Sequence, residues 1–125
     1  MAFSALVIED DEGTRDVLQQ VLLSLGIKVT CAKDGATGLE HIQKHPYDVV
    51  FMDLLLPRVS GFELLEQRDQ IAHLKRCPIV IMTAHSRMRD EVPLGPRDHF
   101  LVKPVPVRDL FSVIGHVIPD LHPVD

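Results

Sequence analysis

The strongest constraint on the fold is an alternation along the whole chain: short apolar runs are separated by longer stretches in which apolar residues recur every three or four positions. Apolar runs without polar alternation are typical of strands buried on both faces, and the three-to-four spacing is typical of amphipathic helices. The pattern therefore predicts an α/β fold, with a parallel sheet between two helical layers. We expect five strands, at residues 5–8, 28–32, 49–52, 79–82 and 100–102.

The helices between these strands are indicated mainly by their ends. The first stops at Gly26, because glycine readily adopts the left-handed backbone of a helix C-cap. The second covers residues 36–44 and ends before Pro46, since a residue that precedes proline is pushed out of the α region. The third begins near Gly61 and ends near Gln70. The predicted inward stripes are Val17, Leu18, Val21, Leu22 and Leu25 in the first helix, and Val107, Leu110, Phe111, Ile114, Val117 and Ile118 in the last.

Residues 84–99 interrupt the alternation. The pattern requires a fourth helix here, but the segment contains Pro93 and Pro96. A proline inside a helix removes a backbone hydrogen bond and clashes with the preceding turn. We therefore predict a fourth helix that is short or irregular; a regular helix of three turns through Pro93 would contradict this.

Length and charge exclude several classes of function. At 125 residues the chain is predicted to form one domain, residues 1–125, with its own core. A formal net charge of −5 repels nucleic acid and anionic membrane surfaces, and no segment has the roughly 20 apolar residues of a membrane span. Cys31 and Cys77 form no disulfide framework, and the amino terminus lacks the basic region of a signal peptide. We expect a cytoplasmic protein.

Polar side chains follow four of the predicted strands. Glu9 and Asp10 follow the first, Asp53 the third, Thr83 the fourth and Lys103 the fifth. Parallel strands joined by crossover helices point the same way, so their carboxyl ends meet at one edge of the sheet. The carboxylates, the hydroxyl and the ammonium group are therefore predicted to share one site.

This set of groups is suited to phosphoryl transfer. Clustered carboxylates repel one another, and a hard divalent cation with oxygen ligands relieves the repulsion; the choice that suits an intracellular protein is Mg²⁺. Lys103 keeps Asp53 ionised and can pair with a phosphoryl oxygen, while Thr83 can donate a hydrogen bond to another. In such a site Asp53 is the nucleophile, and the protein mainly positions groups and neutralises charge.

Four motifs in order, LVIEDD, DVVFMDLLLPRVSG, PIVIMTA and FLVKP, carry a family resemblance over nearly the whole chain. The chain resembles the receiver domain of bacterial two-component response regulators. The resemblance implies a flavodoxin-like, five-stranded parallel sheet of order 2-1-3-4-5 with helices on both faces. It implies that Asp53 takes a phosphoryl group from a histidine kinase or phosphotransfer protein, and that Thr83 and Lys103 complete the site. It also implies a cis bond between Lys103 and Pro104.

The resemblance assigns further roles to single positions. Mg²⁺ would be held by Glu9, Asp10, Asp53 and the backbone carbonyl of Leu55. Thr83 would move toward the phosphoryl group while Phe100 turns inward as the switch; alternatively, Phe100 is a plain core aromatic. Leu55 and His85 hold the positions that tune phosphoryl lifetime. Apolar Leu55 cannot orient an attacking water, so we predict slow self-dephosphorylation unless His85 assists.

Two other functions remain open at this point. A phosphatase of the haloacid dehalogenase type also uses a strand-end aspartate with Mg²⁺, but it needs a second acid where this chain has Leu55. A receiver-like module that never takes phosphate would act through protein contacts alone. A nucleotide-binding Rossmann site is excluded, since Gly35 and Gly38 form no GxGxxG motif.

Several other polar residues are interpreted as structural. Asp11 and Glu12 are expected to be first-turn acids that favour the positive end of a helix rather than metal ligands. His41 and His45 are spaced to bind a metal, but no third ligand is near in sequence.

We expect a receiver that catalyses its own phosphorylation and dephosphorylation and forms no external product. Its signal would pass to a downstream protein target or to an output domain missing from this chain. The usual dimer is not expected, because in the family the fourth helix forms part of the face used for output and dimerisation. The sequence leaves open whether the chain stands alone or is part of a longer regulator.

Overall fold

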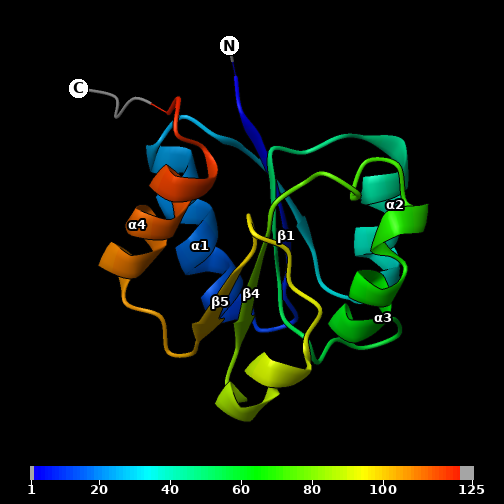
Figure 1. Ribbon diagram of the computed structural model, residues 1–125. Coiled ribbons are helices and arrows are strands. Elements are labelled where there is room, and N and C mark those ends of the chain that lie inside the picture. Colours follow the sequence, from blue (N-terminus) through cyan, green and yellow to red (C-terminus); the bar gives the residue numbers. More distant parts are fainter. Residues whose placement is uncertain (1, 122–125) are drawn as a thin grey trace.

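The computed structural model describes residues 2–121 and contains the predicted parallel sheet at its centre (Figure 1). Its strands are β1 (Ser4–Ile8), β2 (Lys28–Ala32), β3 (Val49–Met52), β4 (Ile79–Thr83) and β5 (His99–Val102). They are all parallel and lie in the order β2-β1-β3-β4-β5, which confirms the predicted topology. All five strands lie within one residue of their predicted bounds.

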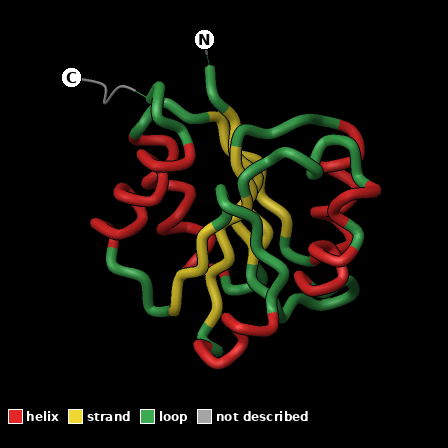
Figure 2. The backbone as a smooth tube through the Cα atoms, viewed as in Figure 1, coloured by secondary structure: helices red, strands yellow, loops and turns green. Residues whose placement is uncertain are grey.

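Helices cover both faces of the sheet, as predicted. α1 (Glu12–Ser24) and α4 (Val107–Val117) lie side by side on one face, and α2 (Gly35–Lys44) and α3 (Gly61–Glu66) lie on the other (Figures 1 and 2). Two separate hydrophobic clusters fill the spaces between the sheet and these two layers. The structure is therefore a three-layer sandwich with a core on each side of the sheet.

Strand β1 shows why the central strands have no polar alternation. Leu6 and Ile8 belong to the core under α2 and α3, whereas Ala5 and Val7 belong to the core under α1 and α4. All four are 0% exposed, since successive side chains of a strand point to opposite faces and both faces are covered. The first residues past such a strand are thereby fixed at the rim of a rigid sheet.

The beginning of α1 is set by Asp11, which is the N-cap. Its Oδ2 accepts hydrogen bonds from the backbone N of Thr14 at 2.8 Å and from Thr14 Oγ1 at 2.7 Å. Capping satisfies amide groups that have no partner within the first turn of a helix. Glu12 is the acid of the first turn, and Gly26 has the predicted left-handed backbone with φ 76°.

Three residues of the predicted inward stripes are not inward, and those predictions were wrong. Val17 is 45% exposed, Val107 46% and Phe111 41%. The buried face of α1 is narrower than the stripe that its apolar periodicity predicts. It consists of Leu18, Val21 and Leu22. The three exposed residues lie at the margins of stripes whose centres pack on the sheet.

The segment between β4 and β5 contains a 3-10 helix, Ser86–Glu91, and no regular helix. This confirms the prediction of a short or irregular fourth helix. The chain then runs irregularly past Pro93 and Pro96, and Val92 is buried against the α2/α3 core. The third helix is also short, because α3 ends at Glu66 and continues as a 3-10 turn, Arg68–Gln70.

Gly61 lets α3 begin close to the end of β3. A Cβ at this position would collide with the backbone carbonyl oxygen of Asp53 and with Leu54 Cα. Glycine is therefore needed for this close approach. Among residues 2–121, no helix is both long enough and apolar enough to span a membrane.

Candidate functional site

The carboxyl edge of the sheet brings together side chains from three strand ends. Lys103 Nζ lies 2.8 Å from Asp53 Oδ2 and also forms an ion pair with Glu9 Oε1. These residues follow β5, β3 and β1, respectively, so groups from widely separated parts of the chain meet at one point. The structure thus places an ammonium group between two carboxylates.

Backbone hydrogen bonds between neighbouring strands fix this arrangement. The amide of Asp53 donates to the carbonyl of Ile8 at 3.3 Å, and the amide of Glu9 donates to the carbonyl of Ala32 at 3.0 Å. On the other side, the amide of Lys103 donates to the carbonyl of Thr83 at 2.8 Å. The ladder of backbone hydrogen bonds therefore continues one residue past the strands and fixes the backbone of the polar residues relative to the sheet. The Lys103–Pro104 bond is cis, as predicted.

Glu9, Asp10 and Asp53 form an acidic cluster. Each offers a carboxylate oxygen, and these oxygens all lie within 4.8 Å of one another. Within residues 2–121, this is the one group of three or more potential ligands with that spacing. Oxygen ligands from carboxylates are what Mg²⁺ prefers.

Glu9 is a buried carboxylate whose negative charge is only partly compensated by its neighbours. It is 1% exposed, and its Oε2 has no hydrogen-bond partner among residues 2–121. Burial raises the pKa of Glu9 because desolvation disfavours the ionised form, and the hydrogen bond and charge of Lys103 offset only part of this effect. A cation beside the unpartnered oxygen would stabilise the ionised carboxylate, so the residues present fit a bound divalent metal ion.

Lys103 remains a cation although it is largely buried. Burial acts to lower the pKa of its ammonium group, but hydrogen bonds to Asp53 and Glu9 and the charges of these carboxylates outweigh burial and raise the pKa. The site therefore contains a fixed positive charge at neutral pH, in direct contact with Asp53.

Thr83 lies at the end of β4 and is fully buried. Its Oγ1 accepts a hydrogen bond from the backbone N of His85 at 3.3 Å. A hydroxyl can accept and donate at once, so this contact leaves the Thr83 O–H available as a donor. His85 itself is exposed, at the beginning of the 3-10 helix.

Leu55 makes a contact that the sequence did not indicate. Its backbone N donates to Asp53 Oδ1 at 3.2 Å, while its side chain is 46% exposed. The two oxygens of Asp53 are therefore held from two sides, by the Leu55 amide and by Lys103. The role expected for the Leu55 carbonyl as a metal ligand stays a prediction.

Phe100 points into the core under α2 and α3 and is 9% exposed. The Arg89 guanidinium carbon lies 5.1 Å from the ring centroid, and Arg89 Nη2 donates to the carbonyl of Phe100 at 3.1 Å. The 3-10 helix is thus tied to β5 by a cation–π contact and a hydrogen bond. Sequence reasoning missed Arg89, since it belongs to no motif and to no regular helical pattern.

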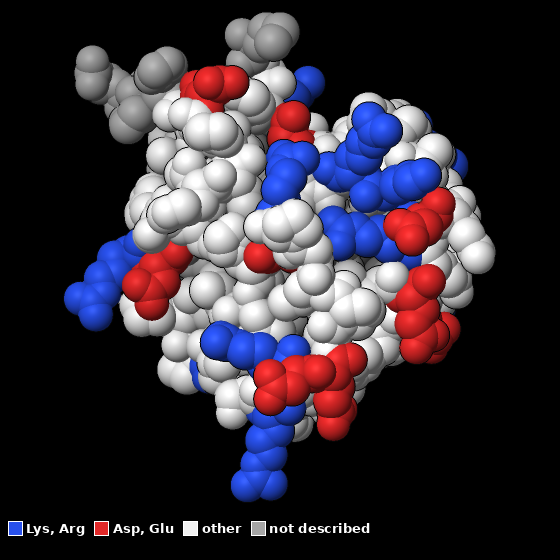
Figure 3. Space-filling model, viewed as in Figure 1, with Lys and Arg blue, Asp and Glu red and all other residues white. Residues whose placement is uncertain are grey.

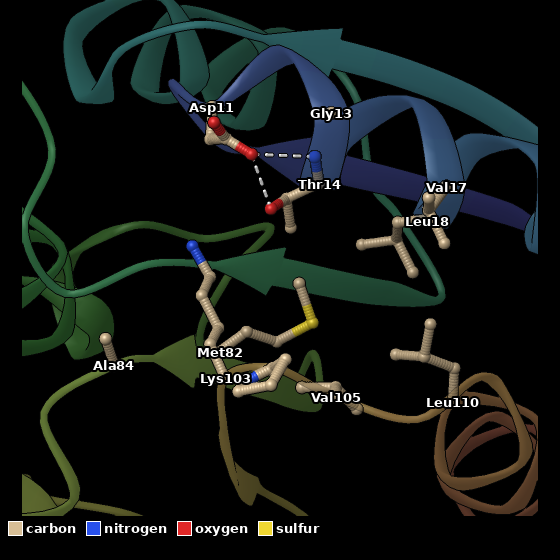
Figure 4. Close-up of a pocket in the computed structure, with 11 residues that line it drawn as sticks. Asp11, Gly13, Thr14, Val17, Leu18, Met82, Ala84, Lys103, Val105 and Leu110 are labelled. Atoms are coloured by element: carbon tan, nitrogen blue, oxygen red, sulfur yellow. Dashed lines mark hydrogen bonds between the residues drawn. The ribbon is translucent and has the colours of Figure 1, made fainter.

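An apolar groove of about 620 Å³ opens beside Lys103, between α1 and the segment that leads into α4 (Figure 4). Figure 4 shows Asp11 and Thr14 at its rim and apolar side chains along its length. These apolar residues are Val17, Leu18, Met82, Val105 and Leu110. The groove therefore places an apolar surface directly next to the polar site.

Comparison with known proteins identifies relatives for most of the chain. The family model described as response regulator receiver domain matches residues 5–115. The chain is 37% identical over 112 residues to the transcriptional regulatory protein DltR of Streptococcus agalactiae, covering 87% of this chain and 49% of that protein. It is 31% identical over 116 residues to the response regulator ArlR of Staphylococcus epidermidis, covering 90% of this chain and 51% of that protein. The chain spans about half the length of these curated relatives.

The fold also has close counterparts among solved structures. The receiver domain of a sensor histidine kinase from Pseudomonas aeruginosa PAO1, solved with a magnesium ion coordinated in its active-site cleft, superposes with a TM-score of 0.84. That similarity covers 95% of this chain and 99% of the solved one, at 24% identity. Because the family model spans β1 to the last turns of α4 and the fold agrees with it, the chain belongs to the response regulator receiver domain family of two-component signalling.

Proposed function

We propose that Asp53 is the phosphoacceptor of this receiver domain and that it takes a phosphoryl group from a histidine kinase or phosphotransfer protein in the presence of Mg²⁺. The observation that carries the proposal is the contact of Lys103 with both Asp53 and Glu9, beside a buried Glu9 oxygen that has no partner among residues 2–121. A purely structural ion pair would not need a third carboxylate, that of Asp10, within 4.8 Å of the two carboxylates that contact Lys103. Membership of the family excludes the phosphatase alternative.

The metal-binding residues of the proposal are Glu9, Asp10 and Asp53, with the backbone carbonyl of Leu55. The magnesium ion of the Pseudomonas aeruginosa receiver supports this choice of metal. When bound, Mg²⁺ supplies positive charge that neutralises the oxygens of the incoming phosphoryl group. The chain's own residues supply the nucleophile, a fixed cation and a hydroxyl donor.

The transfer itself is an in-line displacement at phosphorus. A carboxylate oxygen of Asp53 forms the new P–O bond while the P–N bond of the donor phosphohistidine breaks. The donor ring carries a proton on its other nitrogen and therefore leaves as a neutral imidazole with the electron pair of that bond. Lys103 pairs with one phosphoryl oxygen, and the Thr83 hydroxyl donates to another. The products are an aspartyl phosphate on this chain and a neutral histidine on the donor. The domain is thus a phosphoacceptor rather than an enzyme with an external product.

Asp53→Asn should abolish the reaction, because the amide is not a competent nucleophile. Incubation with acetyl phosphate and Mg²⁺, followed by intact mass measurement, should show one added phosphoryl group on the wild type and none on the variant. Removal of Mg²⁺ with a chelator should suppress the addition to the wild type. Modification of both proteins would move the acceptor elsewhere, and modification of neither would favour a receiver that acts through contacts alone.

The signal is proposed to leave the site through Thr83 and Phe100. Movement of the Thr83 hydroxyl toward the phosphoryl group would shift the chain after β4, which holds Arg89 against Phe100. The signal would pass to a separate protein or to an output domain, since the curated relatives are about twice as long as this chain. The donor protein would contact the groove beside Lys103. We place the whole process in the cytoplasm, within one domain of residues 1–125.

Self-dephosphorylation is expected to be slow. The apolar side chain of Leu55 is half-exposed beside Asp53 and offers no group to orient an attacking water. Leu55→Asn should therefore speed the loss of phosphate by about tenfold, below the 10²-fold typical of full general base catalysis. The measurement is the decay of the phosphorylated mass after removal of the phosphodonor. His85→Ala is the comparison variant: decay equal to that of the wild type would exclude assistance by His85, and slower decay would show it. Wild-type decay within seconds would contradict this prediction.

A further inference from the structure

Two histidines face each other at the opposite end of β5 from the phosphoacceptor site. His99 begins β5, the edge strand of the sheet, and His116 lies in the last turn of α4. Four residues of extended strand, about 13 Å, separate His99 from Lys103. Nothing in the proposed phosphoryl transfer uses either imidazole.

Strand alternation directs His99 toward α4. Phe100 points to the core under α2 and α3, while Leu101 packs against the core under α1 and α4. His99 lies two residues before Leu101 and therefore on the same face of the strand. Both residues line a surface hollow of about 270 Å³ together with Ser112, Val113 and His116.

The two imidazole rings are close and tilted. Their centroids lie 6.2 Å apart, with an angle of 55° between the ring planes. Two imidazoles that share a tetrahedral Zn²⁺ at about 2.0 Å from each nitrogen have centroids about 5 Å apart. The observed separation therefore needs to close by roughly 1 Å, which a side-chain rotation of exposed His116 can supply.

The orientation of His116 is also that of a metal ligand. Its Nδ1 lies 2.8 Å from the backbone carbonyl oxygen of Ser112. A carbonyl only accepts, so Nδ1 carries the proton and Nε2 of the neutral ring carries the free lone pair. Metal-binding histidines are held in this way, with the non-ligating ring nitrogen donating to a backbone carbonyl or carboxylate.

From this geometry we infer that His99 and His116 form a binding site for a divalent transition-metal ion such as Zn²⁺, which would link the edge strand to α4. Imidazole nitrogen favours such ions over Mg²⁺. Asp109 lines the same hollow, but seven helical residues, about 10 Å along the axis, separate it from His116. The remaining ligands are therefore water molecules, and the ion remains accessible to solvent.

The surroundings favour binding by the two rings rather than by general charge attraction. The space-filling view shows mostly uncharged side chains over α4, with basic and acidic groups at its edge, whereas larger groups of charged side chains lie elsewhere on this face (Figure 3). An ion at this position would meet neither a competing carboxylate cluster nor a concentration of positive charge. The site is thus distinct from the acidic cluster of Glu9, Asp10 and Asp53.

The test is a calorimetric titration of the untagged chain with Zn²⁺, in the presence of excess Mg²⁺ to fill the acidic cluster. We expect one Zn²⁺ per chain and shifts of the ring NMR signals of His99 and His116. His99→Gln and His116→Gln should each weaken binding by about tenfold or more. The matched control is the double variant His41→Gln/His45→Gln, which removes the other pair of histidines that are close in sequence. Thermal unfolding without Zn²⁺ verifies that each variant is folded.

Several results would overturn the inference. These are a wild type that binds no Zn²⁺, an unchanged affinity in either single variant, and a loss of binding in the His41/His45 control. Loss of Zn²⁺ binding in Asp53→Asn would place the ion in the acidic cluster instead. Because these readouts need no phosphorylation, their outcome is independent of the role proposed for Asp53.

Discussion

Lys103→Met should lower the rate of Asp53 phosphorylation by about 100-fold, the usual cost of removing one preorganised charge from a transition state. Lys103 Nζ lies 2.8 Å from the carboxylate that receives the phosphoryl group, and its pKa is raised above the ordinary value by two carboxylates. Methionine keeps much of the length of the side chain and removes the charge. The rate is measured from the mass change with time in acetyl phosphate and saturating Mg²⁺.

The same variant should bind Mg²⁺ at least as tightly as the wild type, because Lys103 is not a metal ligand and its charge repels a cation. Burial raises the pKa of Glu9, so ionised Glu9 costs stability as the pH rises through that pKa. Loss of Lys103 increases this cost, and a bound cation offsets it. Lys33→Met is the matched control, since exposed Lys33 follows β2 at the same sheet edge. A folded Lys103→Met protein that is phosphorylated at the wild-type rate would contradict the role of Lys103.

Most of the fold could be predicted because it depends on local patterns. A strand buried on both faces must be apolar throughout, so β2 and β3 were located to the residue and the other strands to within one. The width of a buried helical stripe depends instead on how the helix sits on the sheet. Periodicity therefore could not show that Val17 and Phe111 lie outside the core.

It could be predicted from the topology of the sheet that Glu9, Asp53 and Lys103 lie close to one another. In a parallel sheet every strand ends at the same edge, so the residue after each strand is placed by the fold alone. Contacts made by irregular segments have no such rule. The Leu55 amide on Asp53 and the Arg89 side chain on Phe100 depend on loop conformations that leave no periodic signal.

The contacts that hold the segment before β5 in place were missed for the same reason. Asp98 Oδ1 accepts from the amide of Ile79 at 2.9 Å, and its Oδ2 accepts from the amide of Gly95 at 2.6 Å. Both oxygens also pair with the Arg68 guanidinium. A buried ion pair therefore fastens this segment to the start of β4.

Arg68 completes the network from the other side. Its Nη2 donates to the carbonyl of Cys77 at 2.6 Å and its Nε to the carbonyl of Leu74 at 3.3 Å. The Arg68 side chain is 15% exposed and that of Asp98 is 1% exposed. One guanidinium thus ties the end of α3, the segment before β4 and the segment before β5 into a single unit.

Arg68→Met should lower the free energy of unfolding by about 3–5 kcal/mol, because removal of one partner leaves the other charge buried and uncompensated. Urea unfolding followed by circular dichroism measures the change. Arg76→Met is the matched control: Arg76 is exposed nearby in the chain, and its loss should cost less than about 0.5 kcal/mol. Equal effects of the two substitutions would show that the buried pair contributes no more than a surface charge.

The pH dependence of unfolding, compared between the wild type and Arg68→Met, distinguishes the contribution of the Arg68 charge from that of its packing. Burial acts to raise the pKa of Asp98, but the hydrogen bonds from Arg68 and from the Ile79 and Gly95 amides outweigh it and lower the pKa. A carboxyl group with a lowered folded-state pKa stabilises the fold above its unfolded value of about 3.9 and loses that contribution as the pH falls through the folded pKa. Without Arg68, that pKa should rise, so Arg68→Met should unfold in acid at a higher pH than the wild type. If the acid midpoint stays unchanged while the free energy at neutral pH falls, Arg68 stabilises the fold through its packing and carbonyl contacts rather than through Asp98.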